Sequence, residues 1–171
     1  MRTRILIALS LFSSFPAFAI ETKPIDLGFL APAGSIPPTV TLEDDEGATL
    51  SFRLPSGKEQ REENLGQEFA SFTMAGKPGA FVEAHDIDGD GVAEVIARTV
   101  VPGGDGALYV FRFDGEKGRF NTTQAEDGDE FLYVNPKSAV SVDKNGLVTV
   151  KAGKTSSSYE IRANRFAVRK N

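Results

Sequence analysis

A run of alternating carboxylates between positions 86 and 94 could bind a metal ion. Acids at the first, third, fifth and ninth positions of such a run can converge on one hard cation, and a backbone carbonyl at the seventh position can join them. Gly91, at the sixth position, allows the sharp turn that the loop needs. The spacing therefore predicts a Ca²⁺ site. Its expected ligands are Asp86, Asp88, Asp90, Val92 and Glu94.

The residues around this run predict a loop between two strands. An EF-hand would continue to a Glu at the twelfth position and would lie between two helices. The twelfth position is Ala97, and residues 80–84 and 92–101 are rich in β-branched residues without helical periodicity. An ordinary acidic turn is the alternative reading, because Asp-Gly pairs are common in hairpins. Mutual repulsion of four acids favours a filled site, and we expect the ion to be structural.

The combination of strand, acidic loop and strand resembles the FG-GAP and VCBS repeats of integrin-like β-propellers. The resemblance covers roughly residues 80–113, and Glu94 stands where these repeats more often have Asp. It implies small antiparallel sheets that are similar to propeller blades, with one calcium loop between two strands. Only one copy of the motif is visible, and the chain is too short for a complete propeller.

The first nineteen residues predict a secretory signal peptide. Arg2 and Arg4 precede an apolar stretch at residues 5–12, and the small residues Ala17 and Ala19 mark a cleavage site. We therefore expect cleavage near Ala19 and a periplasmic or secreted protein. No apolar run approaches the length of a membrane span.

Cleavage would make the chain more acidic. It removes two of the 19 basic residues and none of the 24 acidic ones, so the formal net charge changes from −5 to −7. This charge disfavours nucleic acid as a partner and favours a basic protein. The chain has no cysteine, so rigidity must come from packing or from a metal ion.

The remaining pattern predicts an all-β fold in a single domain, residues 39–171, preceded by an extended arm at residues 20–38. Residues 56–64 are charged and are expected to form a solvated loop. Asn145-Gly146 predicts a type I′ hairpin turn. The expected strands are residues 39–42, 48–54, 69–74, 80–84, 92–101, 107–113, 119–122, 130–134, 139–142, 147–151, 158–162 and 165–169.

Two of these strands should form the centre of the fold. Residues 92–101 place apolar side chains on both sides, which predicts a strand covered on both faces. In the next strand Tyr109, Phe111 and Phe113 share one side and are expected in the core.

The sequence does not favour an enzyme. With no cysteine, nucleophilic catalysis would have to use the one histidine, His85, which is better placed to cap the turn beside the acidic run. No phosphate loop, nucleophile elbow or zinc signature occurs. A carboxylate pair for glycoside cleavage stays open, because separation in space is not written in the sequence. We expect no catalytic residues.

A rigid exported domain with polar loops suits binding to another protein. In size, address and its single loop the chain resembles immunity proteins and lysozyme inhibitors, which implies that it blocks a secreted peptidoglycan hydrolase such as an amidase or muramidase. The expected contact is the loop of Gly103, Gly104, Asp105 and Gly106, a narrow tip on a rigid base. These glycines could equally form a permissive hairpin loop. The alternatives are a calcium-dependent adhesion or glycan-binding module and a purely structural protein.

Overall fold

The computed structural model describes residues 23–31, 33–44, 47–101, 104–162 and 165–169. The expected signal peptide, residues 1–19, lies outside them. Within the described part, sixteen strands form three sheets, and the one helical element is a short 3-10 turn, η1 (Gly28–Leu30). The prediction of an all-β fold built from small, mainly antiparallel sheets is confirmed. No helix in this part of the chain is long and apolar enough to span a membrane.

The first sheet has four strands in chain order. They are β1 (Ile25–Asp26), β2 (Thr39–Glu43), β3 (Ala48–Arg53) and β4 (Glu59–Gly66). β1 belongs to the expected N-terminal arm and is followed by Leu27, which is fully buried. The expected loop at residues 56–64 is wrong, because most of it forms β4. A charged strand is stable here because β4 is the sheet edge, where charges can face water and discourage further pairing.

The middle sheet has six strands. Its main path is β11 (Arg119–Thr122), β10 (Gly106–Asp114), β9 (Glu94–Val100) and β5 (Glu68–Phe69); β12 (Leu132–Val134) also pairs with β10, and β8 (Val82–His85) with β9. Six of the seven residues of β9 are buried. This strand is therefore central, as the sequence predicts.

The third sheet joins segments that are far apart in the sequence. Its order is β16 (Arg165–Val168), β15 (Thr155–Arg162), β14 (Leu147–Ala152), β13 (Ala139–Val142), β6 (Phe72–Met74) and β7 (Lys77–Ala80). β13 and β6 are parallel. The single strand expected at residues 69–74 is wrong, because β5 and β6 lie in different sheets. Residues 69–74 look like one strand in the sequence because Phe69 and Phe72, which lie on either side of the change of sheet, are both buried.

Arg98 of β9 ties this crossing to the rest of the chain. Its guanidinium donates hydrogen bonds to the backbone carbonyls of Ser71 at 2.6 Å, Ser138 at 2.9 Å and Pro136 at 3.1 Å. Only 6 % of the residue is exposed, and burial lowers its pKa from the ordinary value. Arg98 thus holds both loops, β5–β6 and β12–β13, by which the chain passes from the middle sheet into the third.

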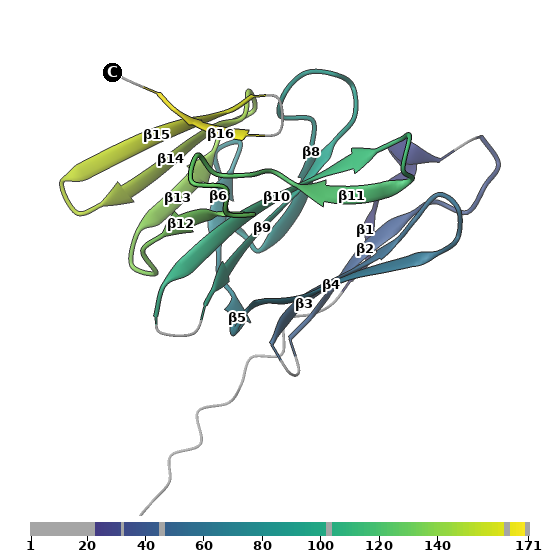
Figure 1. The fold of residues 1–171 in the computed structure, drawn as a ribbon, viewed down its shortest axis with the longest axis horizontal. Helices are drawn as coiled ribbons and strands as arrows, with labels where there is room; N and C mark the ends of the chain where they lie inside the picture. The colour runs from purple at the N-terminus through teal and green to yellow at the C-terminus, as the bar shows by residue number, and fades with distance from the viewer. Residues whose placement is uncertain (1–22, 32, 45–46, 102–103, 163–164, 170–171) are drawn as a thin grey trace, which may run out of the picture.

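The middle sheet lies between the other two (Figure 1). It has a hydrophobic cluster on each face. Alternation in β10 divides the side chains: Tyr109 and Phe111 enter the cluster with the first sheet, whereas Leu108 and Val110 enter the cluster with the third. The Phe111 ring lies 5.5 Å from that of Phe52 in β3. Tyr109 and Phe111 are thus core residues, and Phe113 is partly buried against the same cluster.

Candidate metal centre

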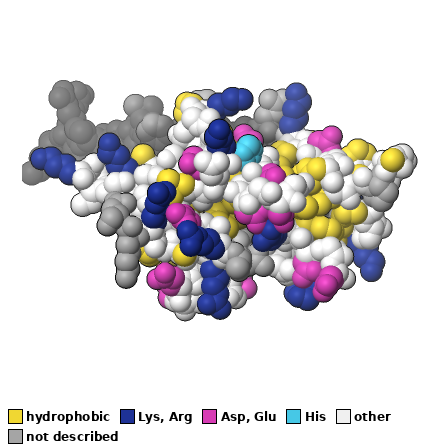
Figure 2. Space-filling model, turned by 90° about the horizontal axis from the view of Figure 1, so that it is seen from above, with side chains coloured by type: hydrophobic (Ala, Val, Ile, Leu, Met, Phe, Trp, Pro, Cys, Tyr) yellow, Lys and Arg dark blue, Asp and Glu magenta, His cyan; other side chains and the backbone are white. Residues whose placement is uncertain are grey.

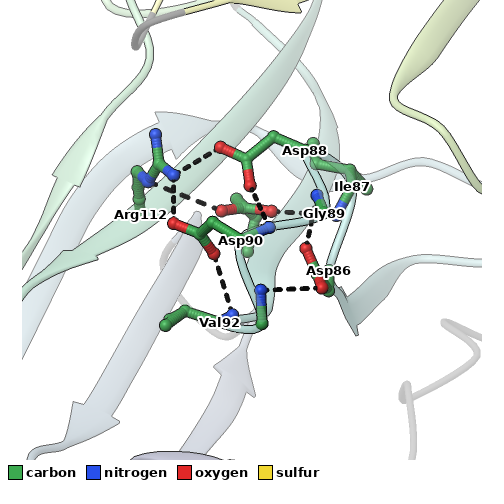
Figure 3. A network of polar contacts seen from close by, with 9 residues as sticks. Asp86, Ile87, Asp88, Gly89, Asp90, Val92 and Arg112 are labelled. Atoms are coloured by element: carbon green, nitrogen blue, oxygen red, sulfur yellow. Dashed lines mark hydrogen bonds and ion pairs between the residues drawn. The ribbon is translucent and has the colours of Figure 1, made fainter.

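The acidic loop connects β8 and β9, which are neighbours in the middle sheet and pair from His85 opposite Glu94. The two strands therefore fix both ends of the loop. Between them, Asp86 folds the chain back by accepting the N–H of Gly89 at 2.8 Å and of Gly91 at 3.0 Å (Figure 3). Both glycines have positive φ, 77° and 88°, which few other residues adopt without strain.

Three of the expected ligands converge. Asp86, Asp88 and Glu94 can each offer a carboxylate oxygen, and these oxygens lie within 4.8 Å of one another. Glu94 is 2 % exposed because it is the first residue of a strand covered on both faces. Its Oε2 accepts the N–H of Ile87 at 3.0 Å, whereas its buried Oε1 has no hydrogen-bond partner.

The protonation of Glu94 reflects this environment. The pKa of its carboxyl is raised from 4.5 to about 7, mainly by burial; the negative charge of Asp88 also raises it, while the hydrogen bond from Ile87 and the positive charge of Arg112 oppose the shift. A positive charge placed near this carboxylate would favour its ionised form. The buried oxygen and its neighbours fit a hard cation that prefers oxygen ligands, as Ca²⁺ and Mg²⁺ do.

Arg112 of β10 also faces the loop. Its Nη2 forms ion pairs with one oxygen each of Asp88 and Asp90, and its Nε lies 3.7 Å from Oε1 of Glu94 (Figure 3). The register between β9 and β10 ends with Val95 opposite Phe111, which brings the adjacent residues Glu94 and Arg112 next to each other. The spacing of the acids does not point to Arg112, which comes close to them only through the register between β9 and β10.

Asp90, another expected ligand, has other contacts, and the ligand expected from the backbone carbonyl of Val92 stays a prediction. Asp90 Oδ1 accepts the N–H of Val92 at 2.8 Å, and its Oδ2 accepts a hydrogen bond from Arg112. These two interactions hold the pKa of Asp90 below its ordinary value. Asp90 is outside the converging group of three.

A hairpin of the third sheet presses against the loop. Gly146, between β13 and β14, approaches Ile87 so closely that a Cβ atom on it would lie 2.6 Å from the Ile87 carbonyl oxygen. The predicted type I′ turn is wrong, because Gly146 has φ 75° but Asn145 does not have positive φ. Asp143 Oδ1 instead accepts the N–H groups of Asn145 and Leu147, which closes a longer turn.

The loop expected to contact a partner is only partly open. Gly103 lies outside the described residues, while Gly104 and Asp105 are exposed. Gly106 is buried as the first residue of β10, and a Cβ atom there would lie 2.7 Å from the carbonyl oxygen of Val134. In the described part of this loop, Gly104 and Asp105 are therefore the residues that a partner could touch.

No protein-family model matches the chain, and no curated protein or solved structure is significantly similar to it.

Proposed function

We propose that the loop of residues 86–94 binds one Ca²⁺ ion, which holds the turn between β8 and β9 in place. The observation that carries the proposal is the buried Oε1 of Glu94, which accepts no hydrogen bond and lies beside Asp86 and Asp88. A buried carboxylate oxygen that accepts no hydrogen bond costs free energy, which the Arg112 contact at 3.7 Å offsets only in part, and a directly bound divalent cation would offset the rest. The role is structural, because the oxygens come from a turn fixed between two strands.

Arg112 offers a competing explanation, in which the loop is an internally neutralised turn. One guanidinium faces Asp88, Asp90 and Glu94, with Asp86 close by. A single positive charge leaves this group with excess negative charge, which supports binding of a further cation.

Calorimetric titration of Ca²⁺ into the chelator-treated mature protein tests this proposal. We expect one ion per chain, and Asp88→Asn should weaken binding by about tenfold or more, equivalent to at least 1.4 kcal/mol. Asp105→Asn, at an exposed acid outside the loop, is the matched control and should bind normally. A parent protein that takes up no Ca²⁺ would identify the loop as the Arg112-neutralised turn.

We further propose that the domain is an exported inhibitor that blocks a peptidoglycan hydrolase, such as an amidase or muramidase. The signal-like residues 1–19 and the charge of −7 after their removal support an exported protein with a basic partner. On the face drawn in Figure 2, acidic and basic side chains are interspersed. Attraction of a partner would therefore depend on local surfaces such as the tip at Gly104 and Asp105.

The test is cleavage of purified peptidoglycan by hydrolases encoded beside this chain, with and without the mature protein. Inhibition that Asp105→Trp abolishes, but that Thr155→Trp at another exposed position preserves, would support the loop as the contact. Inhibition that both variants preserve rejects the loop, and a parent that inhibits none of them rejects the function. A calcium-dependent adhesion or glycan-binding module would instead bind glycan in a manner abolished by a chelator.

A further inference from the structure

Arg112 lies against the same carboxylates that would bind the ion. Its Nη2 forms an ion pair with Oδ2 of Asp88, and its Nε lies 3.7 Å from Oε1 of Glu94 (Figure 3). Asp88 and Glu94 are two of the three residues whose carboxylate oxygens converge. Two of the three carboxylates of the site are therefore already in contact with a positive charge that belongs to the chain.

A guanidinium and a divalent cation cannot both stay in contact with these two carboxylates. A Ca²⁺ ion binds oxygens at about 2.3–2.6 Å, so it would lie within a few ångströms of a guanidinium that kept its present contacts. Two positive charges at that separation repel each other strongly when the groups around them are partly buried. Binding of the ion therefore requires one of the two positive groups to move.

Arg112 is the group that can move. Its side chain is 25 % exposed and has a long stem, whereas Glu94 is 2 % exposed and is fixed at the start of β9. A movement of the guanidinium towards solvent hydrates it again and leaves the buried carboxylate in place for the ion. The ion would thus replace the guanidinium as the partner of Glu94.

Asp90 provides a place for the displaced guanidinium. Its Oδ2 accepts a hydrogen bond from Nη2 of Arg112, its side chain is 42 % exposed, and its carboxylate lies outside the converging group. Arg112 can therefore keep its contact with Asp90 while it leaves Asp88 and Glu94. This contact gives Asp90 a role other than that of a metal ligand.

We propose that Arg112 is a built-in competitor of calcium, which occupies the site when the ion is absent and shifts towards Asp90 when the ion binds. The inference rests on the proposed binding of Ca²⁺ and assigns that site its regulation. Without the ion, the guanidinium reduces the repulsion among the acids, so the loop stays folded. Displacement of Arg112 lowers the affinity for the ion, so the site fills at a higher Ca²⁺ concentration than its carboxylates alone would require.

Calorimetric titration of Ca²⁺ into the chelator-treated mature protein tests the competition. Arg112→Gln removes the competing charge and should bind Ca²⁺ at least tenfold more tightly than the parent. Arg119→Gln is the matched control, because Arg119 is exposed on the neighbouring strand β11 and its side chain donates to Asn121. Its Ca²⁺ affinity should change by less than about twofold. An Arg112→Gln variant that binds no more tightly than the parent would overturn the proposal.

Thermal unfolding shows whether the same residue stabilises the ion-free loop. Without Ca²⁺, Arg112→Gln should unfold at a lower temperature than the parent, because the acids then repel one another more strongly. Saturating Ca²⁺ should raise the unfolding temperature of Arg112→Gln by more than that of the parent or of Arg119→Gln. Equal calcium-induced shifts in the three proteins would contradict the proposal.

Heteronuclear NMR of the arginine side chains in the parent separates displacement from repulsion at a distance, and it needs no variant that folds without calcium. Saturating Ca²⁺ should speed the exchange of the Arg112 Nε–H with water, because this group leaves the buried Glu94, and should leave the exchange of the Arg119 Nε–H unchanged. An Arg112 Nε–H that exchanges equally slowly with and without the ion would overturn the proposal.

The titrations also separate this inference from the proposed function. Uptake of Ca²⁺ by neither the parent nor Arg112→Gln would reject the calcium site and the competition together. Uptake by Arg112→Gln alone would reject calcium binding by the parent and support Arg112 as the occupant of the site. Uptake by both with equal affinity would reject only the role of Arg112.

Discussion

At the scale of single residues, Glu94 is an ionisable residue whose carboxyl group is buried. The start of β9 buries it, and the cross-strand position of Arg112 supplies a partial countercharge at 3.7 Å. Desolvation costs more than this contact returns, so the carboxyl pKa rises to about 7. The protonation state of Glu94 should therefore depend on the pH and on any cation bound beside it.

In the presence of a chelator, the free energy of unfolding of the parent protein should fall as the pH rises from 4.5 to 7. The Glu94→Gln variant, which has no carboxyl group to ionise at this position, should lack this loss. The folded state holds the Glu94 proton more tightly than the unfolded chain, with a pKa of about 7 against 4.5. The contribution is therefore complete below pH 4.5 and is lost as the pH rises through 7, by on the order of 3 kcal/mol at most. Urea unfolding from pH 4 to pH 8 measures it; a constant difference between the two proteins would contradict it.

Tyr109 should give a second pH dependence, at alkaline pH. Burial raises its pKa from 10 to about 12, with a smaller contribution from Glu130. The unfolded chain then ionises first, so stability falls as the pH rises from 10 through 12, by on the order of 2 kcal/mol. We expect this loss in the parent and not in Tyr109→Phe when both are unfolded in urea between pH 9 and pH 12.

Tyr109→Phe should lower the free energy of unfolding by only about 1 kcal/mol at pH 7. The Tyr109 hydroxyl donates to the Leu65 carbonyl at 2.9 Å, and the Thr99 hydroxyl donates to the same oxygen at 2.7 Å. Phenylalanine would therefore leave no unpaired acceptor. An alkaline loss of equal size in both proteins would show that other groups cause it.

At the scale of elements, Gln60 joins two sheets as a strand would. From β4, its amide nitrogen donates to the Phe120 carbonyl at 2.9 Å and its amide oxygen accepts the Phe120 N–H at 2.8 Å. Phe120 lies in β11 at the edge of the middle sheet and is 2 % exposed. The side chain thus satisfies backbone groups that have no further strand beside them.

Gln60→Leu should lower the free energy of unfolding by about 2 kcal/mol, because it leaves the N–H and carbonyl of Phe120 unpaired. Gln67→Leu, at an exposed position close by in the sequence, is the control and should change stability by less than about 0.5 kcal/mol. Equilibrium denaturation of both variants measures the difference. Equal effects would mean that the paired amide adds nothing beyond its apolar contacts.

The hairpin at Gly146 should influence calcium binding although it contributes no ligand. Gly146→Ala places a Cβ atom against the Ile87 carbonyl and must displace the backbone between Asp86 and Asp88. Gly153→Ala is the matched control, because Gly153 also has positive φ, 60°, but a Cβ atom there meets nothing within 4 Å. Both variants should lose about 1 kcal/mol from backbone strain.

Only Gly146→Ala should also weaken Ca²⁺ binding, and calorimetric titration of the two variants decides this. Equal Ca²⁺ affinities of the two variants would show that the hairpin at Gly146 does not influence the metal-binding loop.

Sequence patterns predict these elements where the apolar residues form a local pattern, which alternates in β3 and is nearly continuous in β9 and β10. β3, β9 and β10 follow from Phe52, Ile96 and Phe111 with their neighbours, and the acidic run identifies its own loop. β4 escapes this reasoning because its alternating residues are charged, and its pairing with β3 comes from backbone hydrogen bonds. Arg112 escapes it because its approach to the acids depends on the register between two strands, which is a non-local property.

At the scale of the whole molecule, the acidic loop belongs to the sheet that both hydrophobic clusters share. Ile87 of the loop is itself a member of the cluster with the third sheet. Loosening the loop should therefore affect packing well beyond it.

We expect Ca²⁺ at a hundredfold excess over its Kd to raise the free energy of unfolding by about 2.7 kcal/mol. The gain should appear in one cooperative transition, seen equally by far-ultraviolet and near-ultraviolet circular dichroism during denaturation. Unchanged unfolding after chelator treatment would contradict this, and a gain confined to one signal would show that the sheets unfold separately.

The burial of β9 and β10 on both faces also limits how the protein can change over evolutionary time. A strand with one wet face accepts polar substitutions at every second position, as β2 should, because its burial alternates. The first six residues of β9 and of β10 are all buried, so neither stretch has such permissive positions. A substitution in β9 or β10 would require a compensating change in the cluster that the side chain enters. Exposed positions in the first and third sheets could change quickly while these two strands stayed the same.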